Sequence, residues 1–241
     1  MKCYGLIGYP LTHSFSERYF TEKFHTQKID ASYKSIELHS LEALHELVIH
    51  YQLDGFNVTI PYKEKIIPLL DVVDKTAQKI GAVNCVHVYQ QKLIGYNTDH
   101  IGFENSLTPL LPSTKINALI FGNGGAAKAV KFVLNKLNIP FILVSRNEIQ
   151  DAITYADLNE EIMSTHELLI NTSPLGMFPA TTELLPIPYQ YINEHHIAFD
   201  LIYNPEKTAF LKTCKAYNAR IKNGYEMLVI QAEESYKIFT A

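Results

Sequence analysis

Two charged residues of the sequence, Lys63 and Asp99, are of the types that can transfer a proton in a reaction. Lys63 lies just past the strand-like run Gly55–Ile60, which stops at Pro61, and Asp99 ends the polar segment 95–99. An ammonium group can donate a proton to a developing alkoxide and stabilise its charge, and a carboxylate can orient that ammonium. Taken singly, each residue is equally well explained as a solvated lysine or a turn-forming aspartate.

Hydroxyl and amide side chains accompany this pair in short polar segments of the first half of the chain. Ser14 and Ser16 lie in a turn ahead of a helical pattern, and Asn57 and Thr59 alternate on one side of a strand-like run. Asn84 follows another such run. Ligands of open α/β sheets bind beyond the carboxyl ends of the strands. The combination therefore predicts a pocket for a small polyhydroxylated ligand, with one lysine–aspartate pair for proton transfer.

A glycine-rich turn follows the apolar run Ala118–Phe121. Positive φ angles and the close approach of a phosphate both exclude a Cβ, and the N-terminus of the following helix offers N–H groups to a pyrophosphate. A small residue, Ala127, takes the third glycine position of the GxGxxG pattern. The turn predicts a dinucleotide site, and the alternative is a plain structural loop. The residues concerned are Gly122, Asn123, Gly124, Gly125, Ala126 and Ala127.

The end of the next strand indicates which dinucleotide is bound. Enzymes that use NAD carry an acidic residue about 20 residues beyond the turn, where it accepts from the ribose hydroxyl. Here the strand Phe141–Val144 ends in Ser145-Arg146-Asn147, with no acid. Arg146 can form charge-assisted bonds to a 2′-phosphate, which favours NADP. A solvated loop arginine is the alternative interpretation.

The elements that must position these residues alternate between strand and helix. Short apolar runs separated by helical stretches are typical of strands buried on both faces of a mainly parallel sheet. A second set of such runs begins after about residue 100, so we expect two α/β domains with a boundary near 99–114.

The composition excludes several classes of protein. The 241 residues are 47% hydrophobic with a formal net charge of −4, which argues against a nucleic-acid binder that relies on basicity. No apolar run is long enough for a membrane span, and we expect no secretory leader. Three scattered cysteines predict reduced thiols in a cytoplasmic protein, and the histidine spacing predicts no metal site.

Taken together, the motifs resemble the shikimate dehydrogenase family over nearly the whole chain. Their order along the sequence matches that of the family. The segments that carry the resemblance are GYPLTHSFS, GFNVTIPYKE, GAVNCV, GYNTDHIGF, GNGGAAKA, NTSPLGM, DLIYNP and GYEMLVIQA.

The resemblance implies NADPH-dependent, reversible reduction of 3-dehydroshikimate to shikimate in aromatic amino-acid biosynthesis. It also implies an α/β fold with a substrate domain at 1–99 plus 225–241, a Rossmann-like doubly wound domain at 100–224, and a cleft between them. Lys63 and Asp99 match the catalytic pair. The substrate residues implied are Ser14, Ser16, Asn57, Thr59, Asn84, Tyr203 and Gln231. The cofactor residues implied, besides the glycine-rich turn, are Ser145, Arg146, Thr172, Leu201, Gly224 and Met227.

The sequence departs from the family at the cofactor site. The family's Asn-Arg-Thr motif and second basic residue are replaced by Ser145-Arg146-Asn147, followed by a stretch, 148–161, that has no lysine or arginine. Strict preference for NADP is therefore weakened. A quinate/shikimate dehydrogenase that uses NAD is one alternative, and a non-catalytic nucleotide-binding regulator is another, although both catalytic residues are present. The size permits a monomer or a homodimer acting on a small-molecule substrate.

Overall fold

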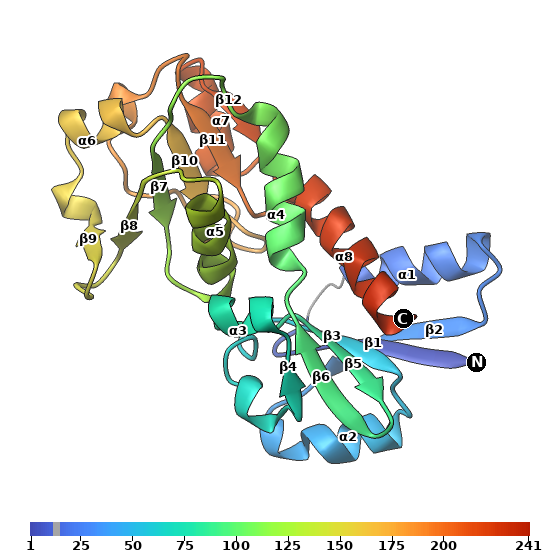
Figure 1. The fold of residues 1–241 in the computed structure, drawn as a ribbon. Helices are drawn as coiled ribbons and strands as arrows, with labels where there is room; N and C mark the ends of the chain where they lie inside the picture. The colour runs from blue at the N-terminus through green and yellow to red at the C-terminus, as the bar shows by residue number, and fades with distance from the viewer. Residues whose placement is uncertain (12–14) are drawn as a thin grey trace. The chain divides into compact units, whose positions relative to one another are not determined.

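The computed structural model describes residues 1–11 and 15–241, which form two units (Figure 1). The first unit contains residues 1–98 and 231–241, and the second contains residues 99–230. Asp99 and residues 225–230 therefore group with the second unit. Ser14 lies outside the described residues.

The first unit is built on a mixed six-stranded sheet with the order β2-β1-β3-β5-β6-β4. β1 pairs in parallel with β2 and β3, whereas β5 runs antiparallel to β3 and β6. The hairpin between β5 and β6 turns at Gln90 and Gln91, whose φ angles are both positive, as a tight two-residue turn requires. The strands are β1 (Lys2–Gly8), β2 (Ala31–Glu37), β3 (Gly55–Val58), β4 (Val72–Val73), β5 (Cys85–Tyr89) and β6 (Lys92–Tyr96).

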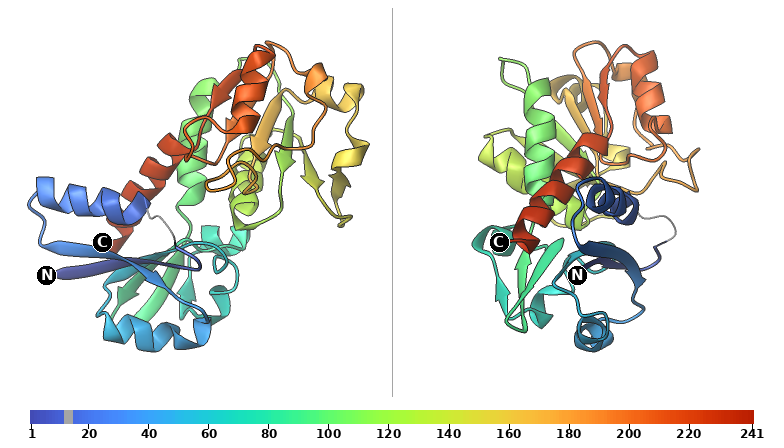
Figure 2. Two further views of the ribbon diagram at one scale, coloured as in Figure 1. Left: turned by 180° about the vertical axis from the view of Figure 1, so that it is seen from behind. Right: turned by 90° about the vertical axis from the view of Figure 1, so that its right-hand side faces the viewer.

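Helices cover both faces of this sheet because its strands alternate their side chains between two apolar cores. On one face, Tyr4 of β1 packs with α1 (Phe15–Thr26) and with the C-terminal part of α8 (Tyr225–Phe239). On the other face, Ile7 packs with residues of α2 (Leu44–His50). Figure 2 shows α1 and α2 on opposite faces of this sheet. The short helix α3 (Lys75–Ile80) precedes β5. The last turns of α8, far from α1 in sequence, thus complete the core of the first unit.

The second unit contains an entirely parallel six-stranded sheet with the order β12-β11-β10-β7-β8-β9. From β7 the chain adds β8 and β9 on one side of the sheet, and it then returns to add β10, β11 and β12 on the other side. Doubly wound dinucleotide-binding sheets have the same change of side. The central strands β7, β10 and β11 are buried throughout, which explains why they are apolar except for Asn171 and Asp200 at the ends of β10 and β11. The strands are β7 (Ala118–Phe121), β8 (Phe141–Ser145), β9 (Ala152–Thr154), β10 (Leu168–Asn171), β11 (Ile197–Asp200) and β12 (Arg220–Lys222).

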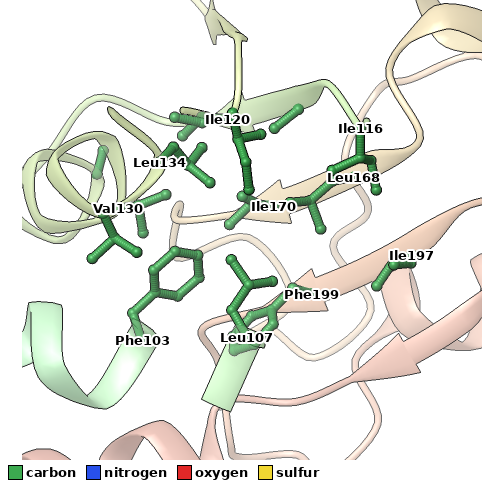
Figure 3. Packing of buried hydrophobic residues seen from close by; sticks show 14 of the residues in the cluster. Phe103, Leu107, Ile116, Ile120, Val130, Leu134, Leu168, Ile170, Ile197 and Phe199 are labelled. Atoms are coloured by element: carbon green, nitrogen blue, oxygen red, sulfur yellow. The ribbon is translucent and has the colours of Figure 1, made fainter. Parts of the chain in front are cut away.

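Helices again cover both faces of the second sheet. α4 (Asp99–Leu107) and α5 (Gly125–Lys136) cover one face, where Phe103 meets Phe199 of β11 edge-on with ring centroids 5.2 Å apart (Figure 3). α6 (Glu160–Thr165) and α7 (Ala209–Ala216) contribute to the core on the other face. Within the described part of the chain, no helix is long and apolar enough to cross a membrane.

Candidate active site

In the first unit, the predicted pocket residue Asn84 lies at the point where three strands meet. Its backbone carbonyl accepts from the amide of Val58, which ends β3, and its own amide donates to the carbonyl of Tyr96, which ends β6. Asn84 immediately precedes β5. The sheet therefore fixes the backbone of Asn84, and the side chain, 2% exposed, has little freedom to move.

The side chain of Asn84 binds two residues that are distant in sequence. Its Nδ2 donates to Thr98 Oγ1 at 3.0 Å and to Gln231 Oε1 at 3.2 Å. Its Oδ1 accepts from the backbone amide of Thr98 at 2.6 Å. Two residues predicted for the substrate, Asn84 and Gln231, are thus brought together. Thr98, which the sequence analysis missed, joins them.

Asn57, from β3, belongs to the same buried cluster. Its Nδ2 donates to the carbonyl of Asn84 at 3.1 Å, and 5% of the residue is exposed. Thr59 follows β3 directly and is half-buried; a Cβ on Gly8 would lie 2.4 Å from its Cγ2, so the glycine makes room for this threonine.

Lys63 and Asp99 occupy different units. Lys63 is half-buried, and its carbonyl accepts from the amide of Val83 at 2.7 Å, which ties the segment after β3 to the segment that carries Asn84. Asp99 is the first residue of α4 and is 5% exposed. Ser16 is buried in the first turn of α1 in the first unit, whereas Tyr203, predicted beside the substrate, follows β11 in the second.

In the second unit, the predicted glycine-rich turn joins β7 to α5. Gly122 has a φ of +111°, and a Cβ there would lie 2.8 Å from Thr172 Oγ1. Thr172, predicted for the cofactor, donates from its amide and its hydroxyl to the carbonyl of Phe121, each at 2.9 Å. The turn and the segment after β10 are therefore packed against each other.

The turn also has room for a group that the chain itself does not supply. Gly124 caps α5 with an extended backbone, and a Cβ at this position would meet no atom within 4 Å. Packing therefore does not require glycine at Gly124, whereas the close approach of a phosphate would. The first turn of α5 carries no acidic residue that would repel an anion. These features fit a bound dinucleotide. Of the other turn residues, Asn123 is exposed, Gly125 and Ala126 are half-buried, and Ala127 is fully buried.

Arg146 follows Ser145, the last residue of β8, and is exposed to solvent. Burial raises the pKa of Tyr155 to about 12, and the nearby charge of Arg146 acts in the opposite direction. Arg146 therefore lies near Tyr155, whose ring stacks on that of Phe121 with centroids 6.0 Å apart. Arg146 is thus an exposed cation just past the end of β8, in the unit that also carries the glycine-rich turn.

The remaining residues predicted for the cofactor gather beside β11. A Cβ on Gly224 would lie only 2.0 Å from the carbonyl oxygen of Leu201, so the close backbone approach requires glycine. Met227 is 7% exposed and belongs to the core against which Leu201 packs. The amide of Leu201 donates to the carbonyl of Asn171 at 3.0 Å.

A buried carboxylate in this region, that of Asp200, escaped the sequence analysis. Its Oδ2 accepts from Thr208 Oγ1 at 2.6 Å and its Oδ1 accepts from the amide of Ile202 at 3.0 Å. Burial raises the pKa of Asp200 to about 7, and its hydrogen bonds partly oppose that rise. The signal available in the sequence was an acid at the end of an apolar strand.

The parallel sheet with its glycine-rich turn defines a dinucleotide-binding α/β protein, joined to a unit with a buried cluster of amide and hydroxyl side chains. Groups of histidine, cysteine and acidic residues that could hold a metal are absent from the described residues. This class includes dehydrogenases that act on small hydroxylated substrates.

Comparison with known proteins identifies the family to which the chain belongs within this class. Residues 6–86 match the family model described as the shikimate dehydrogenase substrate binding domain. A protein of Clostridium beijerinckii named shikimate dehydrogenase (NADP(+)) is 39% identical over 99% of this chain and 92% of its own length. The chain belongs to the shikimate dehydrogenase family.

Solved structures agree with this assignment. The shikimate dehydrogenase of Aquifex aeolicus has a TM-score of 0.89 and 34% identity, over 99% of this chain and 92% of its own. That of Thermus thermophilus, solved in complex with NADP(H) and shikimate, has a TM-score of 0.87 and 29% identity, over 100% of this chain and 94% of its own. The family and the fold class predicted from the motifs are confirmed.

Proposed function

We propose that this protein is a shikimate dehydrogenase that reversibly reduces 3-dehydroshikimate to shikimate with NADPH, a step of aromatic amino-acid biosynthesis. The observation that carries the proposal is the 39% identity to an NADP-dependent shikimate dehydrogenase, which extends over 99% of the chain. Its cofactor is NADP.

Substrate recognition is assigned to residues 1–99 and 225–241, and cofactor binding to residues 100–224. Ser14 and Ser16 bind the substrate carboxylate, with Tyr203 nearby. Ring hydroxyls are held by Asn57, Thr59, Asn84 and Gln231. The buried amide cluster supports this assignment, because fixed amides discriminate between the positions of hydroxyl groups better than mobile ones.

Lys63 and Asp99 carry the proton chemistry of the reaction. NADPH, when bound, supplies the hydride that the ketone carbon receives. The ammonium of Lys63 donates a proton toward the ketone oxygen and stabilises the negative charge that develops there. The carboxylate of Asp99 orients this ammonium and accepts a hydrogen bond from a substrate hydroxyl.

The open space at Gly124 and the acid-free first turn of α5 support pyrophosphate binding there. Arg146 contacts the 2′-phosphate. Thr172, Leu201, Gly224 and Met227 border the nicotinamide half.

Initial rates with shikimate and with quinate, each with NADP and with NAD, test the proposal. We expect shikimate with NADP to give the highest kcat/KM. Faster turnover of quinate with NAD would indicate the catabolic relative instead. Dinucleotide binding without turnover of either substrate would indicate a regulator.

The cellular context is also part of the proposal. The cysteine content and charge balance of the sequence support a cytoplasmic enzyme that acts on small molecules without nucleic acid, as a monomer or a homodimer.

A further inference from the structure

Asn57 is held in the first unit by hydrogen bonds to both ends of its amide. Tyr33 Oη donates to Asn57 Oδ1 at 2.8 Å. Asn57 Nδ2 donates to the carbonyl of Asn84 at 3.1 Å and to Ser235 Oγ at 2.8 Å. Both amide hydrogens of Asn57 are thus given to protein acceptors, so a substrate hydroxyl that meets this side chain meets it at Oδ1.

The hydroxyl of Ser235 sets the direction of the bonds around it. Ser235 Oγ donates its single hydrogen to the carbonyl of Gln231 at 2.8 Å, one turn earlier in α8. It can therefore only accept from Asn57 and from Thr98 Oγ1, which lies 3.0 Å away. Thr98 Oγ1 therefore donates its hydrogen to Ser235 Oγ, and it accepts a hydrogen bond from Asn84 Nδ2.

Tyr33 extends this network towards Ser16. Tyr33 lies in β2, is 4% exposed, and stacks on Phe20 of α1 with ring centroids 4.6 Å apart. Burial raises the pKa of the Tyr33 phenol well above its usual value, and a hydrogen bond with Ser16 acts in the opposite direction. The phenol therefore remains protonated and remains a donor to Asn57.

We propose that Tyr33 and Ser235 are positioning residues of the substrate site: they fix the amide of Asn57 and, through Thr98, those of Asn84 and Gln231. The inference depends on the proposed function, which places these amides against the ring of shikimate. Tyr33 and Ser235 come from β2 and α8, so the network joins both elements to β3, which carries Asn57. Fixed amides bind without first losing rotational freedom, and loosening them weakens binding.

The test uses Tyr33→Phe and Ser235→Ala in the full-length enzyme, because each removes one hydroxyl and little else. Steady-state kinetics give KM for shikimate and for NADP, and calorimetry gives the Kd of shikimate. We expect KM and Kd for shikimate to rise roughly three- to tenfold in each variant, as loss of one internal hydrogen bond implies. KM for NADP is expected to stay at the wild-type value.

Two matched controls separate positioning from general destabilisation. Tyr4→Phe changes a tyrosine that is paired with Tyr33 across β1 and β2. Tyr4 is 2% exposed, and it is not a member of the hydrogen-bond network described above. Ser106→Ala removes a buried hydroxyl that donates within α4, to the carbonyl of Phe103 at 3.1 Å. Both controls are expected to keep the wild-type KM and Kd for shikimate, even where they lower the melting temperature.

A double-mutant cycle tests whether Tyr33 acts through Asn57. In an Asn57→Ala background, Tyr33→Phe is expected to add almost nothing to KM for shikimate, because the acceptor has gone. Two outcomes would overturn this inference and leave the proposed function standing. One is a wild-type KM and Kd for shikimate in both Tyr33→Phe and Ser235→Ala. The other is an equal effect of Tyr33→Phe in the wild-type and the Asn57→Ala backgrounds. A wild-type protein that neither oxidises nor binds shikimate would overturn the proposed function and this inference with it.

Discussion

Asn171 and Asp200 face each other in register at the carboxyl ends of the neighbouring parallel strands β10 and β11, and Asn171 Nδ2 donates to Asp200 Oδ1 at 3.0 Å. Asn171 Oδ1 in turn accepts from the amide and the hydroxyl of Ser173, at 3.0 and 2.7 Å. Asn171 and Asp200 are both fully buried. One carboxylate therefore ties together the two segments that follow these strands and that carry Thr172 and Leu201.

Replacing Asp200 with asparagine should remove a pH-dependent contribution to stability. The pKa of Asp200 is raised by burial to about 7 in the folded protein, whereas an unfolded aspartate titrates near pH 4. Between about pH 4 and 7 the folded state holds one more proton than the unfolded state. The contribution of this group to stability is therefore full below pH 4 and is lost as the pH rises towards 7, by at most about 1.4 kcal/mol per pH unit.

Chemical denaturation of wild type and Asp200→Asn at several pH values between 4 and 8 measures this difference. The free energy of unfolding of the wild type should fall relative to that of the variant as the pH rises. Parallel curves for the two proteins would contradict the assignment. Ser106→Ala is a suitable control, because it removes a buried hydroxyl of the same unit that does not titrate between pH 4 and 8.

Lys63→Ala should lower kcat strongly while KM for shikimate stays nearer to normal. General acid–base groups contribute ~10²–10⁴-fold, and Lys63 also stabilises charge that grows only in the transition state. Steady-state kinetics across pH measure the effect. A variant that keeps half of the wild-type turnover would exclude this role for Lys63.

Ser16→Ala should raise KM for shikimate and leave KM for NADP unchanged. A hydroxyl bound to a carboxylate contributes roughly 1.5–3 kcal/mol, so the expected rise is about one to two decades. Ser14→Ala is expected to behave in the same way. Weakened cofactor binding with normal shikimate binding would place Ser16 on the cofactor side instead.

Arg146→Ala should raise KM for NADP by one to two decades and change KM for NAD little. The guanidinium can bind a 2′-phosphate bidentately, a contact of ~1.5–3 kcal/mol that NAD cannot make. The sequence offers no second basic residue in 148–161, so the wild-type preference for NADP should be moderate. An equal loss for both cofactors would show that Arg146 does not read the phosphate.

The glycines Gly124 and Gly224 should respond in opposite ways to substitution by alanine. At Gly224 the added methyl would lie 2.0 Å from the Leu201 carbonyl oxygen, so the backbone must shift and the melting temperature should fall. At Gly124 the methyl meets no protein atom, so stability should change by about 1 kcal/mol or less, while KM for NADP rises because the methyl stands where the phosphate approaches. Thermal melts and NADP kinetics of both variants check the contrast. An unchanged KM for NADP in Gly124→Ala would contradict the assignment of pyrophosphate binding to this turn.

The sequence by itself determined the features that are local. The largely apolar runs Ala118–Phe121 and Ile197–Leu201 predict buried parallel strands, because such strands need apolar side chains on both faces, and the structure has strands at 118–121 and 197–200. The glycine-rich turn is equally local, since a positive φ at Gly122 is a property of one residue. The order of the motifs indicated the family for the same reason, because each motif is contiguous.

Only the tertiary structure decided how the buried amide side chains of the first unit are held. Asn57 and Ser235 are separated by 178 residues, yet they share a hydrogen bond at 2.8 Å, because the end of α8 packs into the first unit. Periodicity in the sequence identifies which face of a helix is apolar, but not which distant partner a polar residue on it will meet. Tyr33, Ser235 and Asp200 were therefore not predicted: each is an ordinary residue until the fold buries it beside a donor or acceptor that it must satisfy.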